Sequence, residues 1–138
     1  MTEEEIKHWF SYHPPTDETM VKYDEIREAV KHCEETIATM LRSTAQFQDR
    51  QIPFKIVGEA TLKVALTIFR VCPEGADRTA AIRCVRLSRM AINEALVLIF
   101  NGVSERQPLA FNEALRQFTS ELQKARWQAN AAIACHQP

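Results

Sequence analysis

The residues best suited to chemistry in this sequence form the short run Phe10-Ser11-Tyr12-His13-Pro14-Pro15. Both prolines lack a backbone donor, and each restricts the preceding residue to extended geometry. The run therefore places the Tyr12 ring and the His13 imidazole on a stiff elbow just before a helix begins. Rings that stack on a base, beside helix-start N–H groups that donate to a phosphate, suit a nucleotide. The alternative is that Phe10 and Tyr12 fasten the elbow to the hydrophobic core.

A second group of residues suited to ligand chemistry is basic. Arg78, Arg83, Arg86 and Arg89 lie within twelve positions, and Thr79 follows the first of them at an expected helix start. On a helix Arg83 and Arg86 share a face, which Arg89 continues at the next three-residue step. Guanidinium groups beside a helix N-terminus bind phosphates even where the global charge is modest. The alternative is a solvated arginine face that pairs with acidic residues of another helix.

No catalytic or metal-binding signature is present in the sequence. It lacks GxSxG, HExxH, Walker and GxGxxG motifs, and its four cysteines include no CxxC pair. The pairs His32-Cys33 and Cys135-His136 are adjacent in sequence, and neighbours on a helix point about 100° apart, so they rarely ligate one metal ion. We therefore expect no enzyme activity, no metal, no cofactor and reduced thiols.

The composition is that of one globular domain, residues 1–138. The chain is 46% hydrophobic and 25% charged, close to the globular average. A net charge of -1 provides no basic surplus for duplex nucleic acid or an anionic membrane, whereas a small anion needs only a local cluster. No apolar run reaches membrane-spanning length, and the acidic start is not a signal peptide. We expect a cytoplasmic protein.

Hydrophobic periodicity predicts the helices that position these residues. A capping box of Thr2 and Glu5 opens a short helix through about Phe10, and Thr16 or Asp17 caps a second, long helix. Three-and-four spacing of apolar residues predicts further helices at about 78–100, capped by Asp77, and from Ser104 or Glu105 onward. Residues 46–58 break the pattern at Pro53 and Gly58, and residues 60–71 fit helix or strand; we interpret them as helix.

These elements predict an all-α fold, a helical hairpin or bundle in which the second and fourth helices pack antiparallel. The inserted segment is residues 44–71, and the extra C-terminal helix is about 104–134. A faint repeat aligns residues 89–96 with residues 126–133, with Arg, Asn, Ala and a branched aliphatic residue at matching positions. It reflects either a real repeat or the general similarity of Ala-rich helices.

The elbow and the segments around it resemble a known phage family. The first block is residues 10–15 followed by Lys22-Tyr23-Asp24-Glu25-Ile26-Arg27-Glu28-Ala29-Val30-Lys31. The second block is Cys72-Pro73-Glu74-Gly75-Ala76-Asp77-Arg78-Thr79-Ala80-Ala81-Ile82-Arg83, continuing to Arg89-Met90-Ala91-Ile92-Asn93-Glu94-Ala95. Together they resemble the anti-CBASS cyclic-nucleotide sponges, whose helical hairpin is shared with some Thoeris anti-defence proteins.

The resemblance covers about residues 5–43 and 72–97. An FxYHxP elbow before a YxxIR helix is uncommon, so the first block is the more specific. The insertion and the extra helix depart from the shorter family pattern, and residues 122–134 also look like the family's closing helix.

This resemblance implies a non-catalytic phage protein that sequesters cyclic di- or trinucleotides in the infected bacterial cell and so blocks immune signalling. It implies a symmetric homo-oligomer, which we expect to be a dimer-based hexamer. Tyr12 would stack on a base, Lys31 or Arg27 would meet a phosphate, and the helix start at Arg78 and Thr79 would form a trinucleotide-type site. The full set of predicted ligand-binding residues is Tyr12, His13, Arg27, Lys31, Arg78, Thr79, Arg83 and Arg86.

Two other classes stay open. One is a helical oligomer that binds a host or phage protein through its apolar stripes. The other is an enzyme that degrades the same nucleotides.

Overall fold

The structure is a computed structural model that describes residues 1–12, 14–102 and 105–135. The predicted site residue His13 lies outside the described residues. Within them the chain forms helices and no strand, which confirms the all-α prediction. The elements are α1 (Glu3–Phe10), α2 (Asp17–Ser43), the 3-10 turn η1 (Thr44–Gln46), α3 (Gln51–Val71), α4 (Ala76–Phe100) and α5 (Pro108–Cys135).

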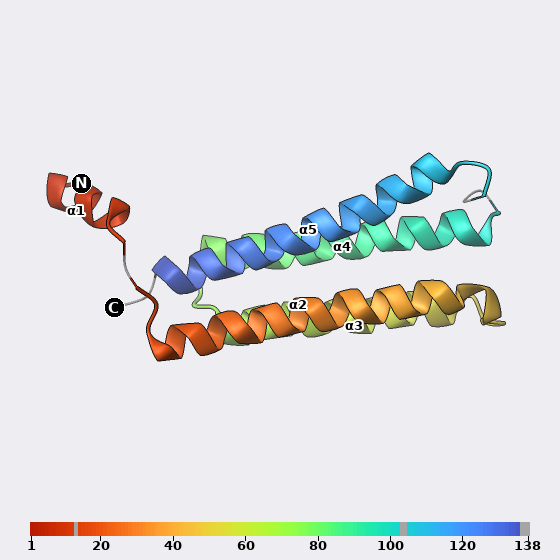
Figure 1. Ribbon diagram of the computed structural model, residues 1–138, viewed down its shortest axis with the longest axis horizontal. Helices are drawn as coiled ribbons and strands as arrows, with labels where there is room; N and C mark the ends of the chain where they lie inside the picture. Colours follow the sequence, from red (N-terminus) through yellow and green to blue (C-terminus); the bar gives the residue numbers. More distant parts are fainter. Residues whose placement is uncertain (13, 103–104, 136–138) are drawn as a thin grey trace.

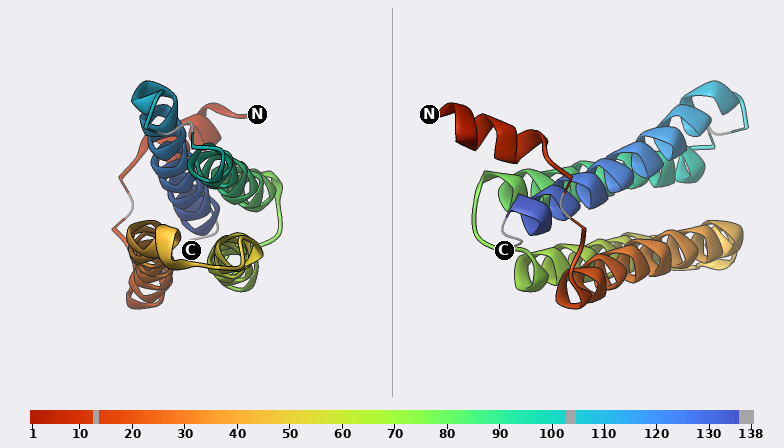
Figure 2. Two further views of the ribbon diagram at one scale, coloured as in Figure 1. Left: turned by 90° about the vertical axis from the view of Figure 1, so that its right-hand side faces the viewer. Right: turned by 60° about the vertical axis from the view of Figure 1, so that its left-hand side comes forward.

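Helices α2 to α5 form an up-and-down four-helix bundle, in which successive helices run in opposite directions along one long axis (Figure 1). Seen end-on, the four helices occupy the corners of a square, with α2 and α4 at opposite corners (Figure 2). Helix α2 packs against α3 and α5, and α4 packs against the same two helices. Each helix therefore has two antiparallel neighbours.

The prediction that the second and fourth helices pack antiparallel is wrong. They run in the same direction at opposite corners (Figures 1 and 2), because α3 is a complete helix that takes the antiparallel place beside α2. Helix α5 fills the other place beside α2, where Gln123 Nε2 donates a hydrogen bond to Glu34 Oε1 at 2.8 Å. Helix α5 thus takes the position beside α2 that the closing helix of a two-helix hairpin would occupy.

The core consists mainly of aliphatic side chains from all four long helices. Its largest fully buried members are Ile26, Ile37, Ile68, Ile92, Leu96, Leu122, Val57 and Val64. Helices α4 and α5 share the most extensive contact, and their facing stripes are rich in buried alanine. Small side chains at a helix contact shorten the distance between the axes.

The two segments of the internal repeat occupy similar environments on α4 and α5. Met90 and Trp127 are both exposed. The Oδ1 atoms of Asn93 and Asn130 are both buried, and neither accepts a hydrogen bond from the described residues. These two pairs of aligned positions therefore agree in burial.

Three helix boundaries differ from the sequence prediction, each for a local reason. Helix α3 begins at Gln51 and includes Pro53 in its first turn, where a missing N–H leaves no hydrogen bond unmade. Gly75, at a φ of 156°, is the residue before α4, so Asp77 lies in the first turn of the helix and does not cap it. The Asp77 carboxylate stabilises α4 through its interaction with the positive end of the helix dipole. Helix α5 begins at Pro108, a residue preorganised for a first helical position.

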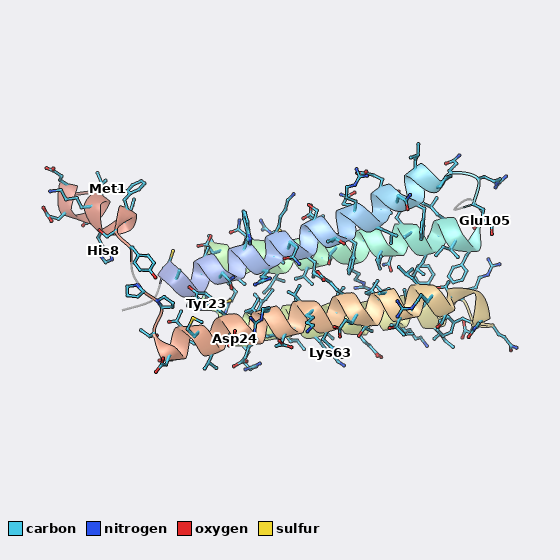
Figure 3. All side chains as sticks on the ribbon, in the orientation of Figure 1. Met1, His8, Tyr23, Asp24, Lys63 and Glu105 are labelled. Carbon is cyan, nitrogen blue, oxygen red and sulfur yellow. The ribbon has the colours of Figure 1, made fainter. Side chains whose placement is uncertain are left out.

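Helix α1 lies beyond the end of the bundle (Figures 1 and 3). Its predicted capping box is confirmed, since Glu5 N donates to Thr2 Oγ1 at 3.2 Å and Thr2 N donates to Glu5 Oε2 at 3.1 Å. None of its eight residues, all within the described chain, is buried. Phe10 is 86% exposed and Tyr12 is 84% exposed, so the two rings do not fasten the elbow to the core of their own chain.

Candidate functional site

The elbow leads directly into a cavity of about 560 Å³ at the end of the bundle, which we call the end cavity. The start of α2, the last turn of α3, the turn after it and the last turns of α5 form its walls. The residues that line it are Thr16, Asp17, Glu18, Thr19, Lys22, Arg70, Val71, Cys72, Pro73 and Ile133. Its volume is in the range of small-molecule binding sites.

The start of α2 is capped by its own side chains. Thr19 N donates to Thr16 Oγ1 at 3.1 Å, and the two threonine hydroxyls are 2.8 Å apart. This confirms Thr16 as the cap. Asp17 and Glu18 already place carboxylates at the positive end of the helix. An anionic ligand in the end cavity therefore depends on basic side chains, from α2 itself and from the other walls.

Three cations from three helices surround this end of the bundle. Lys22 Nζ lies 3.6 Å from Glu18 Oε1, and Arg70 Nη2 lies 2.9 Å from Glu25 Oε2. The Arg78 guanidinium lies 4.5 Å from the centre of the Phe69 ring, and its Nη1 donates to the Phe69 carbonyl at 3.3 Å. Exposed ion pairs contribute about 0–1 kcal/mol each, so a phosphate could replace the carboxylates at little cost.

The thiol of Cys72 lines the same cavity, and its pKa responds to the nearby charges. Burial raises the pKa of Cys72, while the positive charges of Arg78 and Lys22 lower it by a smaller amount. Cys72 Sγ donates to the Ala129 carbonyl at 3.5 Å, which ties the α3–α4 turn to α5. The thiol is therefore protonated near neutral pH and serves the packing of the turn.

The structure brings three of the predicted site residues to this end of the bundle: Tyr12, Arg78 and Thr79. Tyr12 precedes the cap of α2 by four residues, and Thr79 Oγ1 donates to the Gly75 carbonyl at 3.2 Å at the start of α4. Both helix starts lie at the end of the bundle from which the elbow leaves, near the labelled Tyr23 (Figure 3).

The other predicted residues lie farther along the bundle, on two helices at opposite corners. On α2, Arg27 pairs with Asp24 at 3.2 Å, and Lys31 is exposed one turn later. On α4, Arg83 is exposed, and Arg86 lines a separate hollow against α3. Within one chain these four residues form no common site with Tyr12.

Sequence reasoning missed two cations of the end cavity, Lys22 and Arg70. Lys22 begins the helical part of the first block of the family resemblance, but no spacing rule singled it out. Arg70 lies in the segment that fitted either helix or strand, so its face could not be assigned. Their convergence depends on the pairing of α2 with α3, which local patterns do not encode.

Among the described residues, no three His, Cys, Asp or Glu side chains are grouped in a way that would hold a metal ion. None of the helices in the described part of the chain has the length and apolar character that crossing a membrane requires.

The fold and the end cavity define an all-α bundle with an N-terminal helical arm. No protein-family model, no curated protein and no solved structure matches this chain.

Proposed function

We propose that this protein binds and sequesters a cyclic oligonucleotide messenger of a bacterial immune system, and does so without catalysis. The observation that carries the proposal is the Tyr12 ring, which is 84% exposed on the proline elbow, four residues before Thr16 in the wall of the end cavity. An exposed aromatic ring on a restricted backbone is preorganised to stack on a base.

The charges of the end cavity support the same class of ligand. A cyclic dinucleotide carries two phosphodiester charges. Lys22 and Arg70 line the end cavity, and Arg78 on α4 lies near enough to lower the pKa of the cavity residue Cys72. Arginine presents a planar fork of donors that matches phosphate oxygens. Val71 and Ile133 add apolar surface against which a sugar or a base can pack.

The thiol in the cavity supports binding rather than turnover. The nucleophile in a cysteine reaction is the thiolate, and burial raises the pKa of Cys72. The Sγ atom also donates to a backbone carbonyl instead of facing a general base. This environment favours an inert thiol.

The biological setting of the proposal follows from the family resemblance. It places the protein in the cytoplasm of an infected bacterial cell, where a phage protein would keep immune effectors inactive. It also includes a homo-oligomer, a dimer-based hexamer, in which Arg27, Lys31, Arg83 and Arg86 could meet a ligand held by another chain. The exposed rings of Trp9 and Phe10 support assembly, because such apolar surface is normally covered.

A panel of cyclic di- and trinucleotides tests this function. The purified protein is incubated with each nucleotide, desalted and denatured, and the released ligand is identified by mass spectrometry. Intact ligand from wild type and from Tyr12→Phe, with loss in Tyr12→Ala, supports a binder that stacks on Tyr12. Chemically altered ligand indicates an enzyme, and no retention of any nucleotide at micromolar protein refutes the proposal.

A protein-interaction module is the second candidate. It is favoured by the exposed stripe of Leu62, Leu66 and Phe69 on α3, which are 53%, 56% and 56% exposed. The nucleotide panel separates the two functions, since an interaction module retains no nucleotide.

A further inference from the structure

Two apolar surfaces among the described residues bear on assembly, and the first lies on the outer face between α3 and α4. Leu62, Leu66 and Phe69 recur at helical spacing on α3, so they form one stripe. Leu62 and Phe69 are seven residues apart, which corresponds to about 10 Å along the helix. More than half of each side chain is accessible to solvent. We call this surface the α3–α4 groove.

Basic side chains of α4 form the opposite wall of the α3–α4 groove. Arg86 and Arg89 line a hollow of about 150 Å³ together with Leu62 and Ala65 of α3. Gly58 of α3 lies beside the Arg89 guanidinium, since a Cβ at that position would be in van der Waals contact with Arg89 Nη2 at 3.8 Å. The groove therefore combines an apolar stripe with a row of positive charge.

The second open surface is α1, and its character is complementary. Ile6, Trp9 and Phe10 share one face and are 44%, 65% and 86% exposed. Glu3, Glu4 and Glu5 give the helix three carboxylates against the single positive charge of Lys7. The helix has eight residues, about 12 Å in length. Its length, apolar face and net negative charge all match the α3–α4 groove.

Helix α1 also needs a partner to be stable. An isolated helix shorter than about 12–15 residues is marginal in water, and most helical stability comes from packing of the apolar face. The capping box satisfies donors at the start of α1 but covers none of its apolar face.

The elbow between α1 and α2 favours docking of α1 on another chain over docking on its own chain. Pro14 and Pro15 restrict the connection between α1 and α2, and α1 projects beyond the end of the bundle, as the labelled His8 and Met1 show (Figure 3). The α3–α4 groove lies between these two helices, along the side of the bundle. Reaching the groove of its own chain would require α1 to fold back over the bundle end.

We propose that α1 of one chain docks into the α3–α4 groove of a second copy, and that the exchange is reciprocal. A reciprocal exchange closes a two-fold dimer in which both grooves are filled. The apolar stripe covers Ile6, Trp9 and Phe10, and the arginine row faces the acidic first turn of α1. This interface is independent of any nucleotide.

The test uses the full chain and the fluorescence of Trp9. Trp127, the other tryptophan, is 78% exposed on α5, so Trp127→Phe leaves Trp9 as the sole reporter without disturbing the core. Light scattering on this variant at micromolar concentration is expected to give at least twice the chain mass of 15.8 kDa, as a dimer or as the dimer-based hexamer. Trp9 emission is expected to be blue-shifted, and to move to the red when the protein is diluted.

Leu66→Glu places a charge in the groove, and Leu109→Glu makes the same change at a residue that is 83% exposed on α5. Leu66→Glu should raise the dimer dissociation constant at least tenfold and shift Trp9 emission to the red, whereas Leu109→Glu should change neither. Circular dichroism confirms that both variants keep their helices, since both sites lie on the surface.

Three results would overturn the interface. A monomer with solvent-exposed Trp9 means that α1 has no partner. A monomer with buried Trp9 means that α1 docks on its own chain. An oligomer that Leu66→Glu leaves intact means that another surface holds the copies together. All measurements are made without nucleotide, so a failure of the nucleotide panel leaves them interpretable.

Discussion

Replacement of Tyr12 by alanine is the sharpest test of the end cavity. The Tyr12 ring is 84% exposed, so its removal takes almost no buried apolar area from the fold. Surface substitutions of this kind usually change the free energy of unfolding by about 0.5 kcal/mol or less. Any large effect of Tyr12→Ala on ligand binding therefore comes from the bound state.

The expected magnitude follows from stacking. Base–aromatic stacking contributes roughly 1–3 kcal/mol per base. At about 1.4 kcal/mol per decade, Tyr12→Ala should weaken binding of a cyclic dinucleotide by about tenfold to a hundredfold. Tyr12→Phe keeps the ring and loses only the hydroxyl, so its affinity should stay close to that of the wild type.

Isothermal titration calorimetry measures these affinities, and thermal unfolding of the same samples controls for stability. If Tyr12→Ala binds as tightly as wild type while its unfolding midpoint is unchanged, Tyr12 is not part of the site. If Tyr12→Ala instead loses its fold, the ring is a packing residue that is covered in the native assembly. Weaker binding in both Tyr12→Ala and Tyr12→Phe would point to the hydroxyl instead of the ring.

Three further predictions concern charge, packing and pH. Arg70→Gln should weaken nucleotide binding and make it less dependent on salt concentration. Arg116→Gln is the control, because Arg116 also lies 2.9 Å from a carboxylate but should not affect binding. Titration of both variants at two salt concentrations compares them. Leu122→Ala should lower the free energy of unfolding by about 2–5 kcal/mol because Leu122 is fully buried, whereas Leu109→Ala should have little effect; urea unfolding measures both. Burial raises the pKa of Cys33 from 9.0 to about 11, so the folded state keeps its proton where the unfolded state loses it. Its contribution to stability is therefore complete below pH 9 and is lost as the pH rises toward 11, by roughly 2–3 kcal/mol. Urea unfolding at several pH values should show a shallower decline in Cys33→Ala, and an unchanged decline would contradict the assignment.

The parts of the fold that the sequence predicted well are those set by neighbours in the chain. The capping box of α1 and the threonine cap of α2 depend on residues three positions apart, so local chemistry specifies them. The long apolar stripes of α2, α4 and α5 are similarly visible as a three-and-four spacing. The start of α3 was missed because Pro53 suggested a break, although a proline is tolerated in the first helical turn.

The candidate site was predictable only in part. The elbow and the start of α4 could be named from sequence, because prolines and a turn mark them. Lys22 and Arg70 could not, because they meet only when α2 packs beside α3. Arg27 and Arg86 were grouped with Tyr12, yet the bundle places them away from the end cavity on different helices.

The sequence by itself determined where α2, α4 and α5 lie to within a few residues, which face of these three helices is apolar, and where the chain is stiffened by proline. Periodicity carries that information because an apolar stripe marks the face that must be covered. It does not say which helix covers that face, so the order of the bundle and the diagonal placement of α2 and α4 were decided by tertiary packing. The exposure of Trp9, Phe10 and Tyr12 was decided there too. An aromatic residue has the same identity in a core and on a surface, and only the packed chain leaves these three rings uncovered.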